Sequence, residues 1–261
     1  MAIDDILARS LAHPPVVEAV AGIEFRPRGM DVVALVRESD KWSGRYPAVT
    51  AQGALPPTRP VGQPGPGFEM QLGEGLMPVR IWAASADQSW LVQSQDDRLL
   101  LNWRRVVADD SYPGYLGQIR PEFERLLDIV SKQGGADIVP LVAEFSYVNQ
   151  IPTAEAGLHS AYAVFRQPDR AIPGRVVGQR YEVVSQFDHE LGIGQLTVSI
   201  EPAGSPEMTM LTVSAKVFAG RHLAPTEALQ LVDRAHDASK EGFFAIVSDT
   251  ATNQWRGPGE S

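Results

Sequence analysis

The chain of 261 residues contains no cysteine, which excludes disulfide bonds, thiol catalysis, iron–sulfur ligation and zinc sites built from thiolates. Its formal net charge of -9 and its pI near 5.1 argue against broad binding of nucleic acid, because that binding needs a positive face to displace counterions. No apolar run is long enough to span a membrane, and residues 1–13 lack the apolar stretch of a secretory signal, so we expect a cytoplasmic protein with no membrane contact.

The first predicted elements are a short lead, a strand, a helix and a long loop. Residues 1–13 form an N-terminal lead of one or two helical turns, which the Pro14-Pro15 pair ends. Residues 16–25 alternate between apolar and polar positions, which predicts a strand with one face covered. Residues 30–42 have apolar side chains at helical spacing: Val32, Val33, Leu35, Val36 and Trp42. Residues 54–67 contain five prolines and three glycines, which predicts a long mobile loop.

Residues 79–105 hold three of the five tryptophans and predict three short antiparallel strands separated by polar turns. The second turn is Asp96-Asp97, a dipeptide that tolerates the positive φ of a tight hairpin. In the third strand every second residue is apolar, so Leu99, Leu101 and Trp103 share one face. We expect that face to belong to the core.

The rest of the chain repeats this order of elements. A helix is predicted over residues 121–132, with an apolar stripe along it and Gly134-Gly135 after it, and a long strand over residues 138–151. Three further strands are predicted over residues 181–187, 195–200 and 208–218, followed by a long helix over residues 226–247.

A strand meander followed by a long helix thus occurs twice. We expect an α+β fold with antiparallel sheets in two similar packed halves, each a meander with a helix against it. The halves are residues 14–152 and 153–261, after the lead of residues 1–13, and they also fit one compact domain.

Several short motifs are spread in order over nearly the whole chain. They are Pro14-Pro15-Val16-Val17-Glu18-Ala19, Asn102-Trp103-Arg104-Arg105, Tyr112-Pro113-Gly114-Tyr115, Tyr147-Val148-Asn149-Gln150-Ile151-Pro152, and Ala235-His236-Asp237 followed by Phe243 and Trp255. In this set the chain resembles a sporadically distributed bacterial family of uncharacterised proteins of similar length. The resemblance implies no established activity and no catalytic residue. Its patchy distribution is typical of accessory gene neighbourhoods, which often hold defence or toxin–antitoxin genes, and this is an association rather than chemistry.

Known catalytic and cofactor motifs do not occur in the sequence. It contains no P-loop, no G-x-S-x-G elbow, no H-E-x-x-H pair and no dinucleotide-binding fingerprint after a strand. His189 lies between Asp188 and Glu190, but neighbouring side chains in a turn point in different directions. We therefore expect no cofactor and no metal.

The predicted strands carry polar residues that have two interpretations. Three carboxylates would project from one sheet face if their strands were neighbours, and paired carboxylates serve acid–base chemistry: Glu18, Glu24 and Glu144. The favoured interpretation is a structural layer of ion pairs with arginines on adjacent strands: Arg80, Arg98 or Arg104. Further polar groups inside strands would either line a ligand cleft or satisfy one another across strands: Gln93, Asn102, Asn149 and Gln150.

His236 is the histidine of greatest interest because it lies on or beside the apolar stripe of the last predicted helix. Asp233 lies one turn before it and Lys240 one turn after it. The favoured interpretation is a structural hydrogen bond that ties the helix to the sheet, and the alternative is a catalytic or ligand-binding role.

These features favour a noncatalytic binding or regulatory protein that acts on a protein partner, in a bacterial defence or toxin–antitoxin-like context. Its contact surface would be the polar strand face or the proline-rich loop, and an acidic protein would suit a basic toxin. The alternative is a small-ligand sensor or enzyme with a polar pocket between sheet and helices, using Glu18, Glu144, Arg104 and His236. A pocket protein should show a concave polar cluster with strongly perturbed pKa values, and a binding module a flat or apolar patch. A homo-oligomer is a third possibility.

Overall fold

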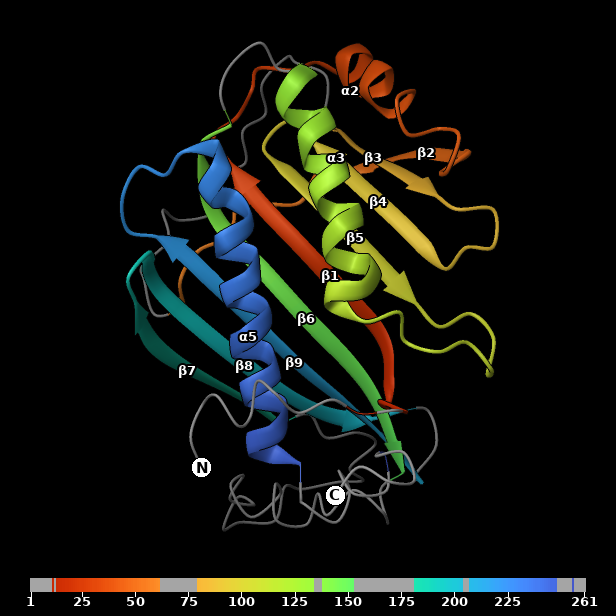
Figure 1. Cartoon of the computed structure of the whole chain (residues 1–261), viewed down its shortest axis with the longest axis vertical. Helices are drawn as coiled ribbons and strands as arrows, with labels where there is room; N and C mark the ends of the chain where they lie inside the picture. The colour runs from red at the N-terminus through yellow and green to blue at the C-terminus, as the bar shows by residue number, and fades with distance from the viewer. Residues whose placement is uncertain are drawn as a thin grey trace, which may run out of the picture.

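The computed structural model describes residues 11, 13–61, 79–133, 138–152, 181–203, 207–247 and 255. These residues form an α+β fold of one large antiparallel sheet and three α-helices (Figure 1). The strands are β1 (Val16–Phe25), β2 (Ala48–Gly53), β3 (Val79–Ala84), β4 (Trp90–Gln95), β5 (Arg98–Arg104), β6 (Pro140–Pro152), β7 (Tyr181–His189), β8 (Gly192–Pro202) and β9 (Met208–Ala219). The helices are α2 (Val32–Ser39), α3 (Arg120–Gln133) and α5 (Ala228–Ile246), with a π-helical turn η1 (Tyr115–Ile119) and a 3-10 turn η2 (Pro225–Glu227).

The nine strands lie in the order β2-β3-β4-β5-β1-β6-β9-β8-β7. β1 pairs with β5 on one edge and with β6 on the other, so the two predicted meanders join into a single sheet. The prediction of antiparallel strands is confirmed, and the prediction of separate sheets is wrong. Alternation along residues 16–25 indicated a strand with one face covered. It carries no information about which other strands pair with the two edges of that strand.

The three helices cover the same face of the sheet (Figure 1). α5 packs on β6 and β9, and α2 packs beside β3. The core lies between this face and the helices, where Ile23 of β1, Leu126 of α3 and Ala235 of α5 belong to one cluster of buried residues. The opposite face of the sheet is called the polar face below. No helix of the described ranges is long and apolar enough to cross a membrane.

The buried side of helix α2 is not the side that its apolar residues predicted. Val33 and Val36 are 51% and 42% exposed, whereas Glu38 is fully buried. The Glu38 carboxylate forms an ion pair with Arg28 and accepts a hydrogen bond of 2.7 Å from Ser94 Oγ on β4. A buried carboxylate is stable when its charge is paired and hydrogen-bonded. Arg28 lies 10 residues from Glu38 and Ser94 lies 56, so both partners are outside the apolar pattern of α2 itself.

Helix α5 lies close to the sheet because it has a glycine on its buried side. A Cβ atom at Gly242 would lie 2.7 Å from Leu196 Cδ2 and 3.0 Å from Val213 Cγ1. A serine makes the polar tie: Ser239 Oγ donates to the Phe145 carbonyl at 2.7 Å and accepts from the Ala215 amide at 3.0 Å. The helix is thus held against β6 and β9 at a depth that also fixes His236.

Candidate ligand-binding site

The sheet separates the polar residues that the sequence singled out. His236 and Asn149 lie on the helix side, where both line a cavity. The other candidates lie on strand positions of the polar face: Glu18, Gln93, Asn102, Arg104 and Glu144. The hypothesis of one pocket that uses Glu18, Glu144, Arg104 and His236 together is therefore wrong, because a sheet with alternating side chains places the first three on the other side from His236.

On the polar face, a row of side chains bonds across four strands. Arg80 Nη1 donates to Gln93 Oε1 at 2.8 Å, and Gln93 Nε2 donates to Asn102 Oδ1 at 2.8 Å. Asn102 Nδ2 then donates to Glu18 Oε1 at 2.9 Å. Gln93 and Asn102 thus bond to each other across strands, as one of the two interpretations predicted, while Arg80 Nε is buried without a partner.

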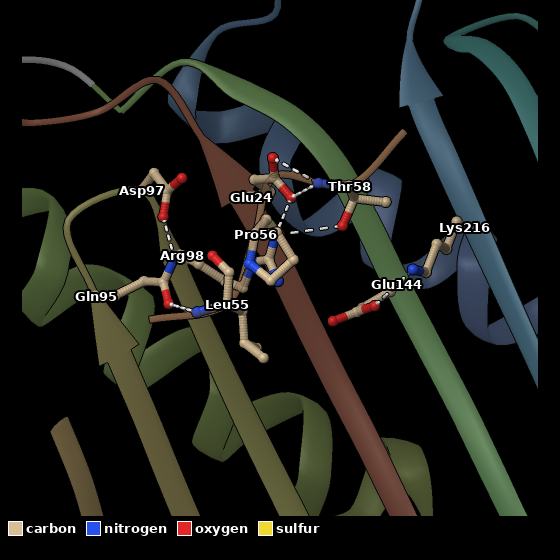
Figure 2. A network of polar contacts seen from close by, with 9 residues as sticks. All are labelled: Glu24, Leu55, Pro56, Thr58, Gln95, Asp97, Arg98, Glu144 and Lys216. Carbon is tan, nitrogen blue, oxygen red and sulfur yellow. Dashed lines mark hydrogen bonds and ion pairs between the residues drawn. The ribbon is translucent and has the colours of Figure 1, made fainter. Parts of the chain in front are cut away.

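Glu24 and Arg98 form an ion pair on the same face, and both side chains are 7% exposed. Figure 2 shows this pair together with the chain segment that lies on it. The Glu24 carboxylate accepts a hydrogen bond from the Thr58 amide at 3.0 Å, and Arg98 Nη2 donates to the Pro56 carbonyl at 3.0 Å. The pair is thus part of the packing of the fold.

Residues 54–61, called the strap below, run along the polar face and are bound there through their main chain. Gln95 Oε1 accepts from the Leu55 amide at 2.9 Å, and Gln95 Nε2 donates to the Leu55 carbonyl at 3.1 Å. Gln195 makes the same two bonds to Val61, at 2.9 and 3.3 Å. The sequence predicted a mobile loop over residues 54–67, and the strap is instead held at both ends, while residues 62–67 lie outside the described ranges.

The remaining candidates of the polar face have partners of their own. Glu144 pairs with Lys216 at 3.7 Å (Figure 2), so the predicted ion-pair layer includes a lysine as well as arginines. Arg104 Nε donates to the Gln88 carbonyl at 2.8 Å. Neither residue lines either of the two cavities described below.

On the helix side, a cavity of about 390 Å³ lies between α5, η1, β6 and the start of β1. Aromatic side chains form much of its wall: Tyr112, Tyr115, Tyr147, His236, Phe243 and Phe244. We call it the aromatic pocket. Lys240 also lines it, and burial lowers the pKa of this lysine.

His236 is 9% exposed and forms part of this wall through ring contacts. Its ring stacks on that of Tyr115, with centroids 3.8 Å apart and planes 9° apart, and it meets the Phe145 ring edge-on at 5.1 Å. Its Nδ1 lies 3.0 Å from Asp237 Oδ1, in the same helix. The predicted polar tie from helix to sheet is therefore made by Ser239 rather than by His236.

Three tyrosines of the wall were not among the sequence candidates, and we call them the pocket tyrosines. Tyr115 donates its hydroxyl proton to Asp233 Oδ1 at 2.6 Å, and the hydroxyls of Tyr112 and Tyr147 lie 3.2 Å apart. Burial raises the pKa of each of these hydroxyls above its ordinary value. Tyr112 and Tyr115 belong to the motif Tyr112-Pro113-Gly114-Tyr115, and they form a wall with Tyr147 because η1 packs beside β6.

Asn149 is a lining residue of the aromatic pocket that carries a buried, unsatisfied polar atom. Its side chain is fully buried, and its Nδ2 donates to the Leu211 carbonyl of β9 at 3.1 Å. Its Oδ1 is buried and has no hydrogen-bond partner. A buried acceptor without a partner destabilises a fold, and it is rare enough in native proteins to need an explanation.

A second cavity, of about 590 Å³, lies between α2, the strap and the β4–β5 turn. Its polar groups serve the fold: Asp96 Oδ1 accepts from the Arg28 and Met30 amides at 3.0 and 2.7 Å, and Asp31 Oδ1 caps α2 through the Ala34 amide at 2.8 Å. The aromatic pocket is therefore the better candidate for a ligand.

Within the part of the chain that the structure describes, no group of three or more His, Cys, Asp or Glu residues is placed to hold a metal ion. Comparison with protein-family models, with curated proteins and with solved structures finds no match for this chain.

Proposed function

We propose that this protein binds a small, mainly apolar molecule in the aromatic pocket, without chemical conversion, as a ligand sensor does. The observation that carries the proposal is a concave aromatic wall with one buried, unpartnered acceptor, Asn149 Oδ1, beside it. Ligand sites in proteins have volumes of about 300–1,000 Å³ and combine an apolar lining with few polar groups. The cavity of about 390 Å³ agrees with that description.

The ionisable groups of the wall support a pocket rather than a flat contact surface. Burial raises the pKa of the pocket tyrosines and lowers that of Lys240, so several groups with perturbed pKa values converge on one concavity. Such convergence is typical of functional sites. His236 lies flat on Tyr115 and is bonded to its neighbour Asp237, an arrangement that suits a binding wall better than proton transfer.

Action on a protein partner in a bacterial defence or toxin–antitoxin-like context stays a prediction, as do homo-oligomerisation and the family resemblance. The polar strand face and the strap, which were the expected contact surfaces, already bond to each other. The edge strand β2 suits a partner better, because all six of its residues are exposed and, among the strands that the structure describes, it pairs on one edge only.

We also infer that the fold consists of two similar halves. In support, the first half holds a meander that ends in β5 and the second half holds one that ends in β9. β6, at the end of the first half, lies between them and pairs with β1 and with β9. α3 follows the first meander and α5 follows the second. On this proposal the aromatic pocket lies where the two halves meet.

Native mass spectrometry of the protein purified from its own host, with no added ligand, tests the proposed function. We expect a retained small molecule in the natural protein. Leu116→Trp, at the exposed rim of the pocket, should reduce the retained fraction. Val107→Trp, at another exposed site that does not line the pocket, should leave it unchanged. A stoichiometric second polypeptide with no small molecule would overturn the proposal in favour of the protein partner.

A further inference from the structure

Strand β2 lies at one end of the sheet, and the register of its neighbours shows where its main-chain groups point. The Ser85 amide, directly after β3, donates to the Trp90 carbonyl of β4 at 2.9 Å. In an antiparallel pair, hydrogen-bonded and non-hydrogen-bonded residue pairs alternate. The residues of β3 that share the phase of Ser85 therefore bond to β4, and Ala84, Trp82 and Arg80 direct their main-chain groups to β2.

Half of the main-chain groups of β2 point away from β3. The partners of Ala84 and Trp82 are Ala48 and Thr50, whose N–H and C=O groups are used in the β2–β3 ladder. The alternate residues direct theirs to the outer edge: Val49, Ala51 and Gly53. In the described ranges no further strand pairs with this edge, and all six residues of β2 are exposed. Three N–H and three C=O groups are therefore in position to extend the sheet.

The outer edge of β2 lacks the features by which natural sheets prevent further pairing. Such edges usually carry a charge, a proline or a bulge. The sequence of β2 is AVTAQG, without charge or proline, and its six pairs with β3 run without a shift of register. The strand at the other end of the sheet, β7, carries Glu182 and Asp188. Of these two edges, β2 is the one that suits the addition of a strand.

A second copy of the chain fits the outer edge of β2. Two β2 strands that pair antiparallel about a two-fold axis offer each other the same main-chain groups, and an axis perpendicular to the sheet keeps the helices of both copies on one side. With the axis at Ala51, Val49 lies opposite Gly53 of the other copy and Thr50 lies opposite Gln52. No charged side chain of β2 then meets another across the axis.

Charge favours β2 over β7 for such a contact. The same arrangement of two β7 strands, with the axis at Ser185, would bring Glu182 opposite Asp188 of the other copy. Like charges directly opposite each other destabilise a strand pair. The chain has a net charge of -9, so two copies repel each other in general, and an uncharged edge allows their closest approach.

We propose that β2 pairs antiparallel with β2 of a second copy, so that two nine-stranded sheets join into one across a two-fold axis. Helix α2 lies at the same end of the sheet (Figure 1) and exposes Val33 and Val36, which adds apolar surface beside the contact. The paired segment is only six residues long. Small interfaces are typical of transient complexes, so we expect a reversible dimer whose fraction rises with concentration. This inference does not depend on the aromatic pocket.

Sedimentation equilibrium of the full chain tests the proposal at concentrations from about 1 μM to about 1 mM, where small interfaces associate. We expect the mean mass to rise from 28.4 kDa toward twice that value. A mass that stays at 28.4 kDa up to the highest concentration would overturn the proposal.

Ala51→Pro locates the contact, because it removes an N–H group that the β2–β3 ladder does not use. Proline is tolerated on an edge strand where the missing N–H faces away from the sheet. Each copy loses one hydrogen bond of the contact, so the dissociation constant should rise about tenfold or more. Ala51→Ser keeps the N–H and should dimerise as the natural protein does. Circular dichroism checks that both variants fold.

Ala51→Lys is a second variant that does not depend on the tolerance for proline. It places two lysines directly opposite each other across the axis, and it should also weaken the dimer about tenfold or more. Its control is Val183→Lys, which adds the same charge at a 40% exposed position of β7 and should leave the dimer intact. A dimer that survives either Ala51→Lys or a folded Ala51→Pro, with its dissociation constant unchanged, would show that the contact lies elsewhere and would overturn the proposal.

Discussion

Replacement of Asn149 by leucine should stabilise the unliganded protein, although it removes a buried hydrogen bond. The free energy of unfolding includes a cost of about 1–3 kcal/mol for a buried acceptor that has no partner. The variant removes that cost for Asn149 Oδ1. It also loses the 3.1 Å bond from Asn149 Nδ2 to the Leu211 carbonyl, and such a bond contributes about 0.5–1.5 kcal/mol. The net expectation is a gain of about 1 kcal/mol, or about 2–4 °C in melting temperature.

Asn102→Leu is the matched control, because Asn102 is also a strand asparagine and is 8% exposed. Both ends of its amide are bonded, to Gln93 at 2.8 Å and to Glu18 at 2.9 Å. Its replacement leaves two partners unsatisfied and should destabilise the protein by about 1–3 kcal/mol. The two variants should therefore move the stability in opposite directions.

Urea unfolding followed by tryptophan fluorescence measures both variants, with the slope m compared to that of the natural protein. An equal slope means that a shifted midpoint reports stability alone. A loss of 1 kcal/mol or more in Asn149→Leu would refute the reasoning, since it would mean that Oδ1 is bonded in solution, for example by an ordered water molecule.

Three further predictions concern the ion pair, a hairpin glycine and the pocket tyrosines. Arg98→Met should lower the free energy of unfolding in urea by about 3–5 kcal/mol because it leaves Glu24 buried without its partner. Adding Glu24→Gln should recover part of the loss, because it removes the buried charge. A double variant no more stable than the single one would contradict this reasoning. Gly192→Ala should destabilise the protein by about 1–3 kcal/mol, since φ is +150° there and a Cβ would lie 1.9 Å from the Phe218 carbonyl oxygen. The control is Gly44→Ala, where a Cβ would lie in open space, and it should change stability by less than about 1 kcal/mol. The pocket tyrosines have pKa values raised by burial, so the folded state holds their protons more tightly than the unfolded chain does. Their contribution to stability is complete below about pH 10 and is lost as pH rises above it. Urea unfolding should therefore have a lower midpoint at about pH 11 than at about pH 9. An unchanged midpoint would count against the burial of these hydroxyls.

Local spacing along the chain was enough to predict most of the elements. The strand expected over residues 16–25 is β1, Val16–Phe25, and the helix expected over residues 121–132 is α3, Arg120–Gln133. The side-chain period of a strand or a helix belongs to a short stretch of sequence, and one covered face leaves a pattern that neighbouring residues suffice to read. The hairpin turn predicted at Asp96-Asp97 does join β4 to β5. The positive φ expected there is wrong, because in the described residues the non-glycine positive φ lies at Gln88, in the turn between β3 and β4.

The joining of the strands into one sheet was decided by tertiary structure, because a strand carries no local mark of the strand that pairs with each edge. The strap is also held by contacts between residues that are far apart in the sequence. Val61 is bound by Gln195, 134 residues further along the chain. The polar face likewise acquired its partners from strands that are separate in sequence, as Asn102 did from Glu18.

The aromatic pocket also depends on tertiary structure. The sequence singled out His236 and Asn149, but it gave them no common site, and it left out Tyr112, Tyr115 and Tyr147. Those residues meet because α5, η1 and β6 pack together, and the free oxygen of Asn149 results from a register that places its nitrogen against Leu211. Periodicity along a chain determines which face a residue occupies, whereas the partner that it meets on that face depends on long-range packing.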